Sequence, residues 1–231
     1  MINWFTFAAP QRFYPLAGTL MRACAIVAAV LGIIGLVLGL LIAPTDFQQG
    51  EAYRIIFVAM AFWSAVGLAF NARLAFMLAR ALAPTGALMC FLALWTGALW
   101  GKPTWGAWWV WDARLTSELI LLFLYLGYLS LHAAIDDTRR ADRAAGVLAL
   151  VGVVNVPIIY FSVKWWNTLH QGASVSVSAA PTMAKPMLAG MLIMTLAFWA
   201  YAIAVTLARV RILIREREAH TTWLEQLQVP V

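Results

Sequence analysis

The sequence predicts an all-α protein, a polytopic transmembrane helical bundle with six spans and both termini in the cytoplasm. Composition, apolar runs and the distribution of basic residues support this prediction. Of the 231 residues, 64% are hydrophobic and only 11% are charged. The mean hydropathy of +0.83 is far above that of water-soluble domains. The lipid bilayer is therefore the expected environment of the chain.

Residues 1–231 are expected to form a single transmembrane domain, because apolar runs recur along the whole chain. Crossing the hydrocarbon as a helix takes about 20 residues. Backbone amides have no water to bond there, and the alternating pattern of barrel strands is absent, so each run is expected to be helical. The six runs cover about residues 23–43, 55–70, 83–99, 115–134, 145–163 and 187–214. The second is the shortest and needs flanking polar side chains that reach the interfaces.

The basic residues fall mainly on one side of these six spans. Eleven of the sixteen lie there, namely Arg12, Arg22, Arg73, Arg80, Arg139, Arg140, Arg143, Arg209, Arg211, Arg215 and Arg217. The positive-inside rule makes this side cytoplasmic and places the loop 100–114 on the outer face. An anionic leaflet explains the net charge of +6, so no nucleic acid partner is required. Asp142, among the arginines after the fourth span, is expected in a solvated turn.

The predicted outer loop is rich in tryptophan. Residues 105–114 read WGAWWVWDAR, with Trp105, Trp108, Trp109 and Trp111 within seven positions. An aromatic belt at the membrane interface is one explanation, although belts usually need fewer tryptophans at each helix end. The density favours a surface for a planar apolar ligand, because each stacked ring adds about 0.5–1.5 kcal/mol beyond area burial. Haem is such a ligand.

Haem also needs a ligand for its iron and cations for its propionates. His170 is the only histidine expected on the outer side, since His132 and His220 lie toward the cytoplasm. Cys24 and Cys90 are not part of a CxxCH motif, so haem b is expected to bind without a covalent bond. The candidate cations for the propionates are Arg54, Lys102, Arg114 and Lys164.

Asp112 directly precedes the fourth span. Asp112 or Thr116 is expected to cap the helix N-terminus, where an acid also interacts favourably with the helix dipole. The first expectation for Asp112 is therefore a structural role.

The stretch WGKPTWGAWWVWDARLTSEL resembles the tryptophan-rich motif of membrane haem-handling proteins in cytochrome c maturation. Together with APTDFQQGEAYRII and GVVNVPIIYFSVKWWNTLHQG, it makes the chain similar to the haem exporter protein C family. The resemblance implies that His170 is the second of two external haem ligands. It also implies that the rest of the haem surface consists of Trp105, Gly106, Trp108, Trp109, Trp111 and Asp112.

The resemblance further implies a place in the bacterial cytoplasmic membrane and a transport role without enzymatic turnover. Haem would be held at the outer face and passed to a periplasmic haem chaperone. An ATP-binding transporter complex and a small membrane subunit would be the other partners.

The chain departs from the family pattern at the first histidine. In the family, a His-Val-Pro segment follows the YRII stretch. In this chain, Ile56 is followed directly by Phe57, Val58 and Ala59. One axial ligand is therefore unassigned. Either His170 alone holds the iron, or water or a histidine of the chaperone is the second ligand. The alternative is a member of the family with weakened or lost function.

Two other functions remain open from the residues. A transporter or channel is disfavoured, because the spans contain few ionisable groups away from their ends. A structural subunit whose tryptophans bind a protein partner is the second alternative, since tryptophan is enriched at interface hot spots.

Overall fold

The computed structural model describes residues 7–38, 52–166, 169, 181 and 184–228. This part of the chain is helical and contains no strand, which confirms the predicted all-α bundle. Its helices are α1 (Pro10–Val37), α2 (Ala52–Phe70), α3 (Arg73–Trp105), α4 (Ala113–Ala134), α5 (Thr138–Gly152), α6 (Asn155–Trp165), α7 (Lys185–Arg217) and α8 (Thr222–Gln228).

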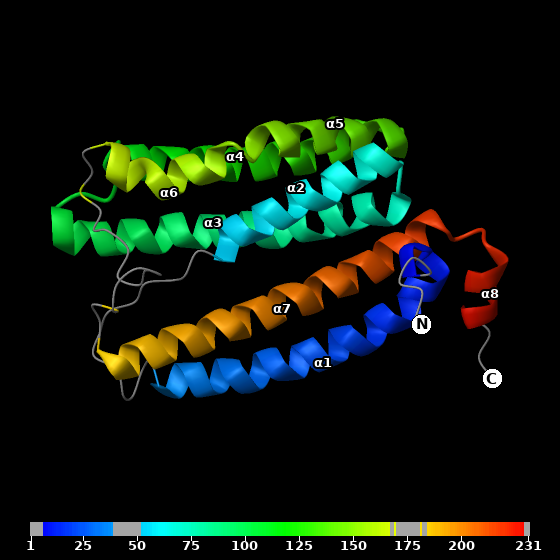
Figure 1. Ribbon diagram of the computed structural model, residues 1–231, viewed down its shortest axis with the longest axis horizontal. Helices are drawn as coiled ribbons and strands as arrows, with labels where there is room; N and C mark the ends of the chain where they lie inside the picture. Colours follow the sequence, from blue (N-terminus) through cyan, green and yellow to red (C-terminus); the bar gives the residue numbers. More distant parts are fainter. Residues whose placement is uncertain (1–6, 39–51, 167–168, 170–180, 182–183, 229–231) are drawn as a thin grey trace.

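The helices run back and forth along the long axis of the molecule (Figure 1). Among the described residues, five stretches are long and apolar enough to cross a membrane: α1, α3, α4, the α5–α6 stretch and α7. The apolar part of α2, Ile56–Phe70, is shorter, as expected for the second run. The α3–α4 connection lies at one end of the bundle, and α8 and the start of α1 lie at the other (Figure 1).

The main core lies between α2, α3, α4, α5 and α6. Phe57 and Tyr125 are fully buried and pack edge to face, with ring centroids 5.0 Å apart. Gly86 of α3 makes room for the Tyr125 side chain, because a Cβ at that position would lie 2.2 Å from the Tyr125 hydroxyl oxygen. Small residues thus let the helices approach closely, as is common in membrane bundles.

A second core joins the α1–α7 pair to α3 at the end of the bundle opposite the α3–α4 connection. It is built from Tyr14 of α1, Met77 and Ala81 of α3, and Val210 and Ile214 of α7. This end of α7 therefore lies against both α1 and α3.

Several helices extend beyond the apolar runs that predicted them. The third run was expected at 83–99, whereas α3 covers Arg73–Trp105. The sixth run was expected at 187–214, and α7 covers Lys185–Arg217. Apolar length marks the part of a helix within hydrocarbon, and the ends that reach the polar interface keep their backbone hydrogen bonds.

The fifth run, expected as one span over 145–163, is divided into α5 and α6. The backbone N–H of Val156 donates to the Val153 carbonyl at 3.1 Å, which makes a tight turn between the helices. Pro157 has no N–H, so it cannot donate to the Val153 carbonyl as a continuous helix would require. The side-chain N–H of Asn155 donates to the Ser117 carbonyl of α4 at 2.8 Å, which ties the start of α6 to α4.

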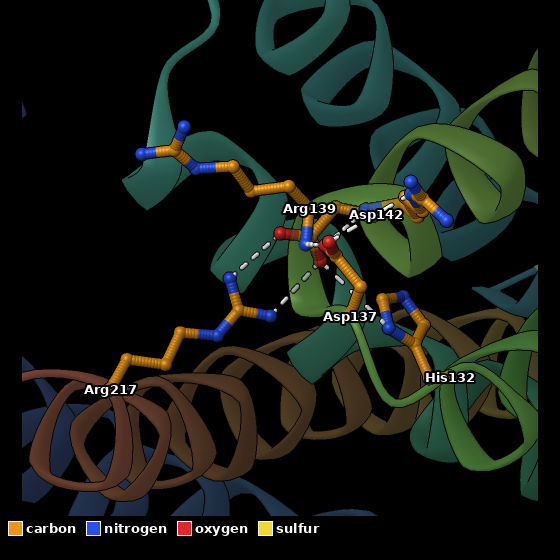
Figure 2. A network of polar contacts seen from close by, with 6 residues as sticks. His132, Asp137, Arg139, Asp142 and Arg217 are labelled. Carbon is orange, nitrogen blue, oxygen red and sulfur yellow. Dashed lines mark hydrogen bonds and ion pairs between the residues drawn. The ribbon is translucent and has the colours of Figure 1, made fainter.

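Asp142 does not lie in a solvated turn, and that expectation was wrong. Asp142 is only 3% exposed, and its carboxylate accepts two hydrogen bonds from Arg217 of α7, at 2.8 and 2.9 Å. The His132 Nδ1 atom lies 3.8 Å from the same carboxylate (Figure 2). The last turn of α7 brings Arg217 onto this carboxylate, a contact that the local charge pattern does not reveal.

Asp137, like its neighbour Asp136, is exposed to solvent. Its side chain accepts hydrogen bonds from the backbone N–H groups of Arg140 and Arg139 and caps the start of α5. The N–H of Arg140, followed by that of Arg139, holds the pKa of the Asp137 carboxyl below its usual value.

Candidate ligand-binding surface

The connection between α3 and α4 is shorter than the loop expected at 100–114. Helix α3 continues to Trp105, and only residues 106–112 lie between the two helices. Gly106 ends α3 with a φ of 76°, and its N–H donates to the Lys102 carbonyl at 3.1 Å. Glycine suits this left-handed conformation because it has no Cβ. Trp105 and Lys102 are consequently held on the last helical turn.

The other end of the connection is fixed by Asp112. Its carboxylate accepts a hydrogen bond from the Leu115 N–H at 2.8 Å, so Asp112, one of the two predicted candidates, caps the fourth span. Its own N–H donates to the Val110 carbonyl at 2.8 Å. Gly106 and Asp112 therefore anchor both ends of the tryptophan-rich connection.

The tryptophans of this region differ in exposure. Trp108 and Trp111 are 56% and 75% exposed, whereas Trp105 and Trp109 are half-buried. The Trp109 and Trp111 rings meet edge to face with centroids 5.5 Å apart. The indole Nε1 of Trp109 is buried and has no acceptor among the described residues. Two rings are thus available to a ligand, and the packing of Trp109 supports one of them.

Lys102 brings a positive charge to these rings. Its Nζ donates to the Gly106 carbonyl at 3.1 Å and lies 5.9 Å from the centre of the Trp108 ring. Arg114 is partly exposed in the first turn of α4. Arg54 lies on α2, but its side chain is outside the described residues. Of the four predicted cations, Lys102 is the one with a described contact to an exposed ring of the connection.

A second aromatic group lies at the end of α6. The Phe161 and Trp165 rings are stacked with centroids 5.1 Å apart, and Trp165 meets Trp166 at 5.9 Å. The Lys164 Nζ lies 5.8 Å from the centre of the Phe161 ring. The end of α6 and the α3–α4 connection lie at the same end of the bundle (Figure 1). His170 follows shortly after in the sequence and lies outside the described residues.

Glu118 is a buried acid that the predicted site did not include. It is 5% exposed in the second turn of α4, within a segment long and apolar enough to span a membrane. Its backbone carbonyl accepts a hydrogen bond from the Cys90 Sγ of α3 at 3.4 Å. The available signal was an acid inside an apolar run, which is costly in a membrane and usually functional.

The fold and this surface define a multi-pass helical membrane protein that displays exposed tryptophans and a cation at one end of its bundle. The model of the heme exporter protein C family matches residues 3–225, and the chain belongs to this family. Membership places it in the bacterial inner membrane, among the haem-handling proteins of cytochrome c maturation.

Individual relatives cover nearly all of the chain. The heme exporter protein C of Haemophilus influenzae is 44% identical over 241 aligned positions, which cover 98% of each protein. The protein of the same name from Escherichia coli is 44% identical over 234 positions, covering 95% of this chain and 94% of that one. A ccmC-like mitochondrial protein of Marchantia polymorpha, named for cytochrome c biosynthesis, is 45% identical over 152 positions, covering 60% and 64%.

These alignments also show that the chain is shortened. An alignment of 241 positions against 231 residues leaves at least ten positions at which this chain has no residue. Helix α2 runs without interruption from Ala52 to Phe70 and contains no histidine. A helix can therefore form here without a His-Val-Pro segment.

Proposed function

We propose that this protein holds haem b, without a covalent bond, at the outer face of the cytoplasmic membrane and presents it to a periplasmic haem chaperone. It catalyses no reaction itself. The observation that carries the proposal is the exposure of Trp108 and Trp111 beside Lys102, on a connection anchored at both ends, in a member of this family. A planar ligand with an anionic edge suits such a surface.

Each part of the surface suits one part of haem. The exposed indoles of Trp108 and Trp111 offer apolar contact to the porphyrin, and the half-buried indoles of Trp105 and Trp109 complete the surface. The buried Nε1 of Trp109 is a hydrogen-bond donor without an acceptor among the described residues, and the Lys102 ammonium carries positive charge; both suit a propionate.

The axial ligand comes from a different segment. We assign this role to His170, whose imidazole is the donor that haem iron takes in many proteins. Of the remaining cations, Arg54, Arg114 and Lys164 are further candidates for the second propionate.

Transfer to a partner requires that haem be held on an accessible surface. Trp111 is the most exposed tryptophan of the connection, which suits release to a soluble chaperone better than a closed pocket does. An ATP-binding transporter complex and a small membrane subunit complete the proposed assembly.

The axial role of His170 is tested by the Soret absorbance of the full chain purified in mild detergent with haem. His170→Ala is expected to shift or abolish the Soret band, because the iron loses its imidazole ligand. His220→Ala is the matched control, since this exposed histidine follows α7 at the opposite end of the bundle. An unchanged spectrum in His170→Ala would remove this residue from the site.

A further inference from the structure

Two arginines of α7 converge on one tyrosine of α1 near the cytoplasmic end of the bundle. The Arg211 guanidinium carbon lies 4.3 Å from the centre of the Tyr14 ring, and that of Arg215 lies 5.5 Å from it. The Arg215 Nε also donates a hydrogen bond to the Tyr14 hydroxyl. Tyr14 is itself buried. It therefore holds both side chains in place.

Gly18, one turn along α1, brings a third guanidinium to the same place. A Cβ at Gly18 would lie 1.8 Å from the Arg211 Nη1, so the absence of a side chain is what admits Arg211 against α1. The Arg22 Nε donates to the Gly18 carbonyl at 3.3 Å. Three cationic side chains thus gather around Tyr14 and Gly18.

This cluster lacks an anionic partner within the described part of the chain. Arg211 and Arg215 are four residues apart on α7, a spacing at which like charges repel. Neither they nor Arg22 forms an ion pair with a described carboxylate, whereas Arg217 of the same helix is paired with Asp142 at 2.8 Å. Arg211 is partly exposed and Arg215 is exposed. A counter-charge from outside the chain can reach them.

We propose that Arg22, Arg211 and Arg215 bind the phosphate group of an anionic phospholipid in the cytoplasmic leaflet. The N–H groups of a guanidinium match the oxygens of a phosphate, and ordered side chains lose less entropy on binding. Clusters of basic residues between helices at this face of a membrane suit anionic headgroups. The same two helices carry exposed aliphatic side chains, Leu20 on α1 and Ile212 on α7, which suit a lipid environment.

The experiment measures which lipid the full chain retains. The protein is purified in mild detergent, incubated with equimolar phosphatidylglycerol and phosphatidylcholine, and analysed by native mass spectrometry. The double variant Arg211→Gln/Arg215→Gln is expected to retain roughly 30-fold less phosphatidylglycerol, because it removes two cations and each of them contributes to the attraction for anionic lipid. Retention of phosphatidylcholine is expected to stay the same.

The matched control is Arg139→Gln/Arg140→Gln, which removes two exposed charges from the start of α5. It is expected to retain phosphatidylglycerol like the unchanged chain. An equal loss in both double variants would overturn the site, because net charge alone would then explain retention.

Two further measurements separate the source of the phosphate and the role of Tyr14. Inorganic phosphate, added to the chain in phosphatidylcholine nanodiscs, is expected to give no protection against thermal unfolding. Protection equal to that from phosphatidylglycerol would overturn the lipid assignment.

Tyr14→Phe keeps all three charges and the ring but removes the acceptor of Arg215, so it is expected to lower retention of phosphatidylglycerol several-fold. An unchanged retention would contradict the ordering by Tyr14.

Discussion

Replacing Trp108 and Trp111 together by alanine is expected to weaken haem binding between about 5-fold and about 150-fold. Each stacked ring contributes about 0.5–1.5 kcal/mol beyond area burial, and 1.36 kcal/mol corresponds to tenfold. Both residues are more than half exposed, so the fold should tolerate the change. The dissociation constant from a haem titration followed at the Soret band measures the effect.

Two variants serve as controls for this loss. Trp199→Ala removes a partly exposed tryptophan of α7 outside the connection and should leave haem affinity unchanged. Trp108→Phe/Trp111→Phe keeps aromatic rings and should retain most of the affinity. Full affinity in the double alanine variant would show that haem does not use these rings.

The second large effect is expected at the end of the bundle opposite the tryptophan-rich connection. Asp142→Ala should lower the free energy of unfolding by about 3–5 kcal/mol, because the Arg217 guanidinium, which is largely shielded from water, then lacks its carboxylate partner. The side chains of Arg217 and Asp142 are only 13% and 5% exposed. Equilibrium unfolding of the chain in mixed detergent micelles measures the change.

Asp137→Ala is the control for removing an acid from the same region, and it should cost much less because Asp137 is exposed. The double variant Asp142→Ala/Arg217→Ala should recover part of the stability lost in Asp142→Ala, since no unpaired charge remains. If Asp142→Ala cost no more than Asp137→Ala, the buried pair would not hold α7 to α5.

The helical class and the succession of spans could be predicted because a membrane helix must satisfy its backbone within itself. The ends of helices could not be obtained from apolar length, as the extension of α3 from Arg73 to Trp105 shows. The break between α5 and α6 had a signal in Asn155 and Pro157. Its position follows from the hydrogen bond of Asn155 to α4, which is a tertiary contact.

In the candidate site, too, features set by neighbours in sequence could be predicted, whereas features set by tertiary contacts could not. The cap of α4 depends on neighbours in sequence, so it could be narrowed to Asp112 or Thr116, and Asp112 forms it. Which tryptophans are exposed depends on how the connection folds back, so Trp111 and Trp109 could not be distinguished beforehand. The roles of His170 and Arg54 stay predictions.

The most direct test of the account is the side of the membrane that the tryptophan-rich connection faces. Single cysteines at Ala107 and Ala219, in a chain with Cys24 and Cys90 changed to serine, are treated in intact cells with a membrane-impermeant maleimide. Reaction of Ala107→Cys in intact cells, with Ala219→Cys reacting only after lysis, is the predicted result. The reverse pattern would place the tryptophans in the cytoplasm and contradict haem presentation at the outer face.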